Sequence, residues 1–176
     1  DKKVWTADVE EDTLCMRYSR PNGEEGYPGT LCTEVRYHLD EENQLQIEYQ
    51  AICDTDTVLN LTNHSYFNLN GHGSGTLQGQ EIQIFADFYT ENDTACLPTG
   101  VIASVADTPM DFRQPHEILE RIDTDFVQLR HAGGYDHNWI PNCFVKEQMR
   151  KCAEVYARKS GIRLAVFSDQ PGIQFY

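Results

Sequence analysis

Basic residues are scarce in this chain. Of its 176 residues, 14 are Lys or Arg, against 28 that are Asp or Glu, and the formal net charge is −14. A surface with this charge repels the phosphates of nucleic acids and the headgroups of anionic lipids. We therefore expect neither a nucleic acid nor a membrane among its partners.

Long apolar runs are also missing. No stretch approaches the roughly 20 residues that cross a bilayer, and the N-terminal DKKVWTADVEED lacks the apolar core of a signal peptide. Hydrophobic residues still make up 40% of the chain, enough for a real core. Because no linker, repeat or low-complexity tract divides the sequence, we expect one soluble, cytoplasmic domain over residues 1–176.

The cysteines lack the spacing of a metal site. None of the six forms a CxxC pair; they are Cys15, Cys32, Cys53, Cys96, Cys143 and Cys152. Zinc sites usually depend on such short spacings, so we expect no metal. We interpret these cysteines as buried thiols that behave as small hydrophobic residues.

Alternation of apolar and polar residues is the dominant pattern, and it predicts β-strands. It is clearest over 31–39 and 45–53, which a polar turn joins into a hairpin. Weaker runs predict strands at 14–18, 82–88 and 162–166, and a second hairpin begins in the later half of 146–161. One short helix is expected at 115–121, opened by Pro115. This pattern favours an all-β fold, an antiparallel β-sandwich.

Three polar clusters are candidates for chemistry. In LTNHSYFNLNG, His64 follows the strand-like run of Val58, Leu59 and Leu61, and a histidine titrates close enough to neutrality to give and retake a proton. The alternative is a structural histidine held by hydrogen bonds.

The second cluster is GGYDHNW, at 133–139. An ionised Asp136 can accept hydrogen bonds from two sugar hydroxyls, and Tyr135 or Trp139 can offer an apolar face to a sugar ring. The alternative is a turn followed by a core tryptophan. A metal held by His64, His72, His137 and Asp136 lacks any supporting spacing.

The third cluster is SDQPGIQFY, at 168–176, where a Pro171-Gly172 turn follows Gln170. The amide of Gln170 both donates and accepts, which suits a hydroxyl ligand, although turn chemistry alone also explains the proline and the glycine.

The order of these segments is more specific than any one of them. EEGYPGTL, LTNHSYFNLNG, LPTG, GGYDHNW and QPGIQFY follow one another along nearly the whole chain. In this succession the sequence closely resembles the aldose 1-epimerases. The resemblance implies a β-supersandwich of the galactose mutarotase type that interconverts the α and β anomers of free hexoses, such as galactose and glucose, without a cofactor.

The resemblance also implies roles for individual residues. His64 would be the general acid that protonates the ring oxygen, with Ser65 and Tyr66 lining the sugar site beside it. Asp136 would accept hydrogen bonds from sugar hydroxyls, and Gln170 would bind the sugar near its reacting end. A carboxylate base would take the proton of the anomeric hydroxyl.

Two segments of the family pattern have no counterpart in this sequence. The family places an Asn-Arg pair and a further histidine before the EGYPG turn, and its glutamate base after QPGIQFY. We therefore expect residues 1–176 to be a partial aldose 1-epimerase domain, an incomplete sandwich whose partners include the missing portions of its own domain. Open sheet edges would make the isolated chain aggregate.

Two alternatives remain open. A hexose-6-phosphate 1-epimerase would share the fold but would need arginines for the phosphate, and Arg113, Arg121 and Arg130 do not adjoin the His64 or Asp136 motifs. An inactive sugar-binding β-sandwich would keep Asp136 and Gln170 without turnover.

The polypeptide of residues 1–176 alone is expected to show little or no mutarotase activity, because ring opening needs both an acid and a base and each is worth about 10²–10⁴-fold in rate. Polarimetry on freshly dissolved α-D-galactose or α-D-glucose measures this directly. Equilibration clearly faster than in buffer would contradict the prediction.

Overall fold

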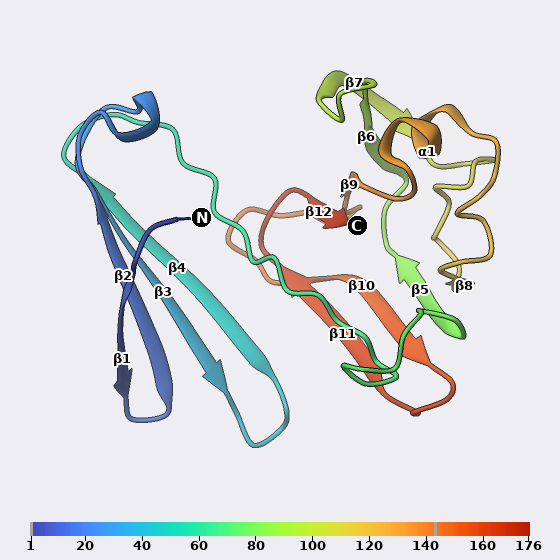
Figure 1. Cartoon of the computed structure of the whole chain (residues 1–176), viewed down its shortest axis with the longest axis horizontal. Helices are drawn as coiled ribbons and strands as arrows, with labels where there is room; N and C mark the ends of the chain where they lie inside the picture. The colour runs from blue at the N-terminus through green and yellow to red at the C-terminus, as the bar shows by residue number, and fades with distance from the viewer. Residues whose placement is uncertain (1, 143) are drawn as a thin grey trace. The chain divides into compact units, whose positions relative to one another are not determined.

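The computed structural model describes residues 2–142 and 144–176, so Cys143 lies outside the described residues. The chain forms two compact units, residues 1–65 and residues 66–176. All paired strands in both units are antiparallel, which confirms the predicted all-β antiparallel fold (Figure 1). The single domain over 1–176 stays a prediction.

The first unit is a four-stranded meander. Its strands lie side by side in chain order: β1 (Thr6–Glu10), β2 (Thr13–Arg20), β3 (Leu31–Leu39) and β4 (Leu45–Cys53). The predicted hairpin of β3 and β4 is confirmed with the expected bounds, and the strand expected at 14–18 is β2. Sequential hairpins of this kind need only short turns, which the polar residues at 40–44 provide.

The two faces of this sheet differ as the alternation predicts. Leu31, Thr33 and Val35 of β3 are buried on one face. On the other face Arg17 forms ion pairs with Glu10 and Glu34 of the flanking strands. Residues that face one another across antiparallel strands share a face, so the register turns the sequence alternation into one apolar and one charged surface.

The EEGYPG segment forms a tight turn, with a 3₁₀ helix at Glu24–Gly26, and side chains fix its end. Asn22 accepts a hydrogen bond from the Gly29 amide at 2.8 Å, and Arg20 donates to the Pro28 carbonyl at 2.8 Å. Gly29 has φ +80°, and a Cβ there would lie 2.4 Å from the sulfur of Cys53. Only glycine fits this conformation and this space.

The second unit contains two further four-stranded sheets. In spatial order, the first is β11 (Arg163–Ser168), β10 (Arg150–Ala157), β5 (Gln80–Ile84) and β8 (His116–Glu117). The second is β12 (Ile173–Phe175), β9 (His137–Ile140), β6 (Phe88–Asn92) and β7 (Pro98–Ser104). The hairpin of β10 and β11 confirms the prediction for the later half of 146–161.

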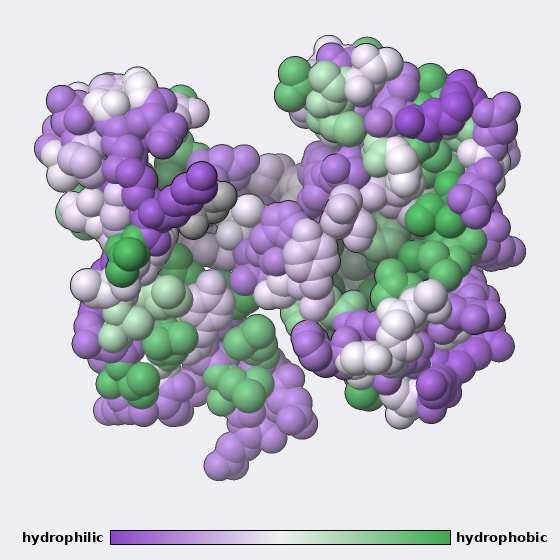
Figure 2. Space-filling view, viewed as in Figure 1, coloured by the Kyte–Doolittle hydropathy of each residue, from purple (hydrophilic) through white to green (hydrophobic). Residues whose placement is uncertain are grey.

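Residues from both sheets build the core of this unit. Ile82 and Ile84 of β5 and Ala153 of β10 pack in one cluster with Tyr89 of β6 and Trp139 of β9. Trp139 is fully buried, and its indole N–H donates to the Met110 carbonyl at 3.1 Å. Hydrophobic residues also reach the surface, where Figure 2 shows them among larger hydrophilic areas on the face in view of each unit.

The helix predicted at 115–121 is wrong. His116 and Glu117 form β8 and pair with β5, and the Ile118 amide donates to the Gln80 carbonyl at 3.0 Å. Pairing with a sheet edge overrides the local signal of Pro115. The described residues of this unit instead form an α-helix at α1 (Val127–Ala132), which ends at Gly133 with φ 69°. A glycine directly after a helix is a usual stop signal.

The strand predicted over 82–88 is also wrong in its extent. β5 ends at Ile84, and the chain then leaves the first sheet of this unit and enters the second as β6 at Phe88. Alternation continues through this crossing because Ala86 is buried between the two strands. Periodicity alone does not reveal a change of sheet.

The cysteines only partly match their predicted burial. Cys15 and Cys152 are buried as expected, whereas Cys32 and Cys96 are exposed. Within residues 2–142 and 144–176, no helix has both the length and the apolar character needed to cross a bilayer.

Gly29, which ends the EEGYPG turn, and Gly23, which directly precedes it, offer a matched test of the turn. Gly29→Ala should lower the free energy of unfolding by about 2–4 kcal/mol, since it adds a steric clash to the cost of a left-handed alanine. Gly23→Ala, with φ +85° and no atom within 4 Å of its Cβ, should cost only about 1–2 kcal/mol. Urea unfolding of both variants measures the difference, and equal losses would show that the contact with Cys53 is not restrictive.

Candidate active site

The segment that carries His64 is not the end of a strand. Val58 and Leu59, expected in a strand-like run, are exposed and lie outside any sheet, as does His64 itself. The strand expected directly before His64 is therefore wrong. Ser65, the last residue of the first unit, is held locally because its amide donates to the Asn63 side chain at 3.1 Å.

A buried glutamine anchors the other end of this segment in the second unit. Gln80 of β5 is 1% exposed; its carbonyl oxygen accepts from the Leu69 amide at 3.2 Å, and its NH₂ group donates to Asn68 at 2.9 Å. Tyr66, which precedes these residues, contacts Tyr176 edge to face with the ring centres 6.0 Å apart. Tyr66 and the end of QPGIQFY therefore lie together.

Alternation along β9 and β12 decides which side chains face outward. Tyr135 and Phe175 stack with their ring centres 5.4 Å apart, and Phe175 also packs on the buried Trp139. Because successive residues of a strand point to opposite faces, Asp136 and Gln174 point away from this aromatic cluster. They meet there: the Gln174 amide nitrogen donates to Asp136 Oδ1 at 2.7 Å.

The aromatic residues of GGYDHNW therefore have the structural role. Trp139 is fully buried and Tyr135 is 5% exposed, with its hydroxyl donating to the Pro109 carbonyl at 3.3 Å. The core interpretation of Trp139 is confirmed, and the suggestion that either ring faces a sugar is wrong. Their contribution to the site is indirect, since they fix the strand that presents Asp136.

The glutamine chosen from the sequence is not the one that meets Asp136. Gln170 is exposed in the turn before β12, and its amide donates to its neighbour Asp169 at 2.7 Å. Gln174 lies on β12 beside Asn138 of β9, diagonally across from Asp136. Sequence reasoning missed Gln174, although its alternation with Ile173 and Phe175 was a usable signal.

Gly172 has a packing role in this turn. A Cβ at this position would lie 2.1 Å from Oδ1 of Asn138, so a side chain here would displace the neighbour of Gln174. Glycine at this position therefore lets the chain before β12 approach β9 closely.

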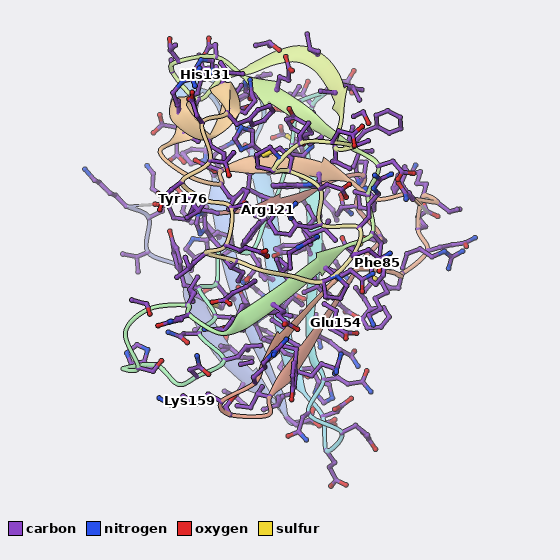
Figure 3. The ribbon with its side chains drawn as sticks, turned by 90° about the vertical axis from the view of Figure 1, so that its right-hand side faces the viewer. Phe85, Arg121, His131, Glu154, Lys159 and Tyr176 are labelled. Carbon is purple, nitrogen blue, oxygen red and sulfur yellow. The ribbon has the colours of Figure 1, made fainter. Side chains whose placement is uncertain are left out.

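Behind Asp136 lies a buried polar network. Gln128 of α1 pairs with the backbone of Asn92: its oxygen accepts from the Asn92 amide at 2.8 Å, and its NH₂ donates to the Asn92 carbonyl at 3.2 Å. The Asn92 side chain donates to the Asp136 carbonyl at 2.9 Å. His131, on the last turn of α1 (Figure 3), donates from Nδ1 to the Asn92 carbonyl at 2.8 Å.

His137 completes this network and is fully buried. Its Nδ1 accepts a hydrogen bond from the Asp136 amide at 3.2 Å, so the ring proton sits on Nε2, which lies 3.1 Å from the Gln128 oxygen. Burial lowers the pKa of His137 below its ordinary 6.5, and nearby His131 acts in the same direction, while the charge of Asp136 opposes both. The ring is therefore neutral at physiological pH.

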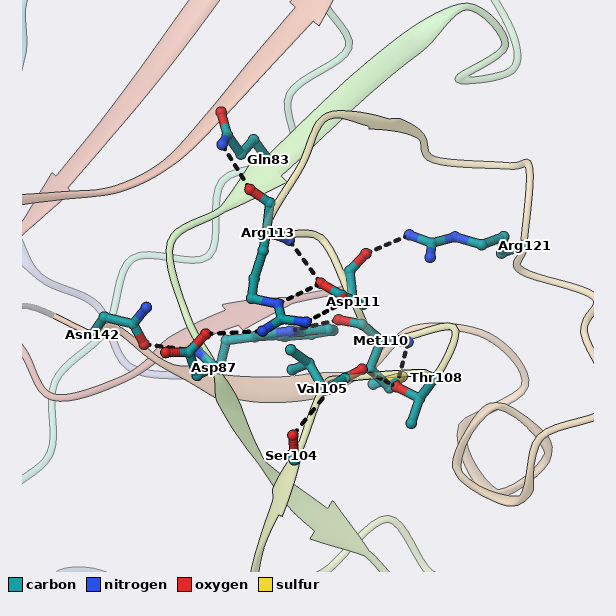
Figure 4. A network of polar contacts seen from close by, with 12 residues as sticks. Gln83, Asp87, Ser104, Val105, Thr108, Met110, Asp111, Arg113, Arg121 and Asn142 are labelled. Carbon is teal, nitrogen blue, oxygen red and sulfur yellow. Dashed lines mark hydrogen bonds and ion pairs between the residues drawn. The ribbon is translucent and has the colours of Figure 1, made fainter.

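The three arginines considered for a phosphate are all engaged elsewhere in the second unit. Arg113 forms an ion pair with Asp111 at 2.7 Å and also contacts Asp87, as Figure 4 shows. Arg121 donates to the Asp111 carbonyl at 2.7 Å, and Arg130 pairs with Asp125. None of these recorded contacts is with Asp136 or Gln174. Among the described residues, no group of three or more His, Cys, Asp or Glu could hold a metal ion.

The chain resembles known proteins along its whole length. A family model described as aldose 1-epimerase matches residues 1–176. The chain belongs to the aldose 1-epimerase family. It is 42% identical to a galactose mutarotase of Rattus norvegicus over 177 aligned positions, and 33% identical to an aldose 1-epimerase of Escherichia coli K12. These matches cover 100% of the chain but 49% and 50% of the relatives, so the chain spans about half the length of the curated relatives it matches.

Solved structures agree with the sequence comparison. A GalM/aldose epimerase homologue from C. elegans superposes with a TM-score of 0.77 at 30% identity, over 97% of this chain and 50% of that protein. A galactose 1-epimerase from Lactobacillus acidophilus NCFM gives 0.75 at 31% identity, over 88% and 45%. The fold predicted from the resemblance is confirmed as galactose mutarotase-like.

The buried His137 makes stability depend on pH. Folding lowers the pKa of His137, so at mildly acidic pH the unfolded chain binds a proton at this residue more readily than the folded chain does. The free energy of unfolding should therefore fall as the pH drops below about 6.5. Urea unfolding between pH 7.5 and 5.5 measures this slope. His137→Gln should remove the His137 part of it, and identical slopes for both proteins would contradict the assignment.

Proposed function

We propose that the protein interconverts the α and β anomers of a free hexose, such as galactose or glucose. Family membership supports the reaction class. The contact between Asp136 and Gln174 is the observation that carries the sugar site, since it places a carboxylate and an amide together on the outward side of a rigid aromatic cluster.

Asp136 is well suited to bind hydroxyl groups. The hydrogen bond to Gln174 uses one lone pair of one carboxylate oxygen, while an ionised carboxylate has about four such acceptor positions. Both backbone groups of Asp136 are already held, by His137 and by Asn92. Its remaining acceptors can therefore receive two sugar hydroxyls without the main chain having to reorganise.

Gln174 replaces Gln170 in our proposal for the sugar site. With its NH₂ group donating to Asp136, its amide oxygen can accept from a further hydroxyl. Tyr66 is included in the proposed site because its contact with Tyr176 brings it to the end of β12. His64 and Ser65 join the site by resemblance to the family.

In the proposed reaction His64 protonates the ring oxygen while a carboxylate base takes the proton of the anomeric hydroxyl. The ring opens to the aldehyde, the C1–C2 bond rotates, and reclosure gives the other anomer. A neutral histidine that has given up its proton can recover it within one turnover, because its ordinary pKa lies close to physiological pH. Asp136 and Gln174 hold the hydroxyls that do not react.

Two other functions are less well supported. A hexose-6-phosphate epimerase needs a cationic group for the phosphate, and the three candidate arginines are bound to other parts of the second unit. A sugar-binding protein without turnover would keep the pair of Asp136 and Gln174. Measuring binding and turnover separately distinguishes such a protein from an enzyme.

The test uses protein expressed from the complete coding region that contains this sequence. NMR titration with galactose measures binding, and exchange between the α and β anomer signals measures turnover. His64→Asn should reduce the exchange rate by about 10²–10⁴-fold while binding weakens much less. Gln174→Leu should weaken binding by about fivefold or more, whereas the matched Gln170→Leu should leave it unchanged.

For each expected result, a specific outcome would contradict the proposal. Binding without exchange in the unsubstituted protein would favour the inactive sugar-binding alternative. If Gln170→Leu weakened galactose binding as much as Gln174→Leu does, Gln170 would be the better candidate for the sugar site. Tighter binding of galactose 6-phosphate than of galactose would favour the phosphate-specific relative.

A further inference from the structure

His137 is a fully buried titratable group that the proposed chemistry does not use. It follows Asp136 directly in the chain and points to the opposite face of β9, into the protein. The ring of Tyr89 on β6 packs against it edge to face at 5.9 Å, so it has little freedom to rotate. A core position of this kind could hold an apolar ring, yet it holds an imidazole with both nitrogens engaged.

The two nitrogens act in opposite senses. Nδ1 accepts from the Asp136 amide at 3.2 Å, and Nε2 donates to Gln128 Oε1 at 3.1 Å. Gln128 also accepts from the Asn92 amide, so its oxygen points in a fixed direction and determines which nitrogen of His137 carries the proton. The chain of contacts from α1 therefore selects the tautomer that can accept from Asp136.

The same network reaches Asp136 by a second route. The Asn92 side chain donates to the Asp136 carbonyl at 2.9 Å, and Gln128 pairs with the backbone of Asn92 through two hydrogen bonds. Both backbone groups of Asp136 are thus tied to one glutamine, which is 4% exposed. With the N–H and the C=O of Asp136 both held by hydrogen bonds, its carboxylate can adopt few orientations.

We propose that His137 is a positioning residue that, through its Nδ1, aims the Asp136 carboxylate at one sugar hydroxyl. This inference rests on the proposed function, since Asp136 must bind the sugar. His137 itself touches no substrate, because it is buried behind the strand. The charges that act on it come from Asp136, directly before β9, and from His131 on α1, and the titratable Tyr89 packs against its ring.

The tautomer is checked first, by ¹⁵N NMR of the histidine ring in the protein expressed from the complete coding region. At pH 7.5 the signals should show a bare Nδ1 and a protonated Nε2. A protonated Nδ1 would overturn the inference even in a fully active enzyme. Absence of galactose binding would instead overturn the proposed function, so the two failures are distinguishable.

Two substitutions separate the two nitrogens. In His137→Asn the short side chain can place its oxygen near the position of Nδ1 and accept from Asp136, while the bond to Gln128 is lost. In His137→Gln the longer amide can reach Gln128, while the acceptor for Asp136 is lost. We expect the dissociation constant for galactose to rise about fivefold in His137→Gln and to stay within about twofold in His137→Asn.

Monodeoxy-galactoses distinguish positioning from a general loss of structure. In the unsubstituted protein, removing the hydroxyl that Asp136 binds should weaken binding. In Asp136→Asn the same removal should have no effect, which identifies that hydroxyl. In His137→Gln, removing that same hydroxyl should raise the dissociation constant by less than it does in the unsubstituted protein. The effects of removing the other hydroxyls should be unchanged. Equal weakening for every sugar, or a larger loss in His137→Asn than in His137→Gln, would overturn the inference.

Discussion

The aromatic cluster around Trp139 is the constraint on which the candidate site depends. Tyr135, Phe175 and Phe112 pack against this indole, and its N–H is satisfied by the Met110 carbonyl. Burying these large side chains removes apolar surface from water, so they occupy the inner face of β9 and β12. Since successive residues point to opposite faces, the intervening residues lie on the outer face. Asp136 and Gln174 are outward because their neighbours are inward. Shifting either strand by one residue would bury the carboxylate and expose the rings, a large cost in desolvation and in lost apolar burial.

A buried polar network can persist in such a core only when its members are satisfied. Gln128, Asn92 and His137 lie at the inner side of the strand that carries Asp136, and their hydrogen bonds follow one consistent set of donors and acceptors. Removing one partner would leave another buried group without its hydrogen bond, which costs more than the bond itself contributes. Asn92 itself is 5% exposed, and its side chain donates to the Asp136 carbonyl.

The alternation of apolar and polar residues was sufficient to predict hairpins, whose strands are neighbours in sequence. It was insufficient for strands that pair with a strand far away in the sequence. The alternation at 31–39 and 45–53 determined both strands and their faces, because each is paired with its neighbour in sequence. The segment at 115–121 failed because β8 is defined by pairing with β5, more than thirty residues earlier. The order of motifs identified the family. It could not predict that Gln174 rather than Gln170 contacts Asp136, since that contact depends on the register of β12 against β9.

His64 and Asp136 stand in contrasting local settings, and the contrast suits their proposed tasks. Asp136 is fixed by two backbone contacts, a glutamine and an aromatic cluster, which is appropriate for a group that must recognise hydroxyls with minimal loss of entropy on binding. His64 lies on an extended segment outside the sheets, anchored beyond it by Gln80 through Asn68 and Leu69. Because binding a hydroxyl costs least when its partner is already held in place, the contacts of Asp136 make it the preorganised part of the proposed site.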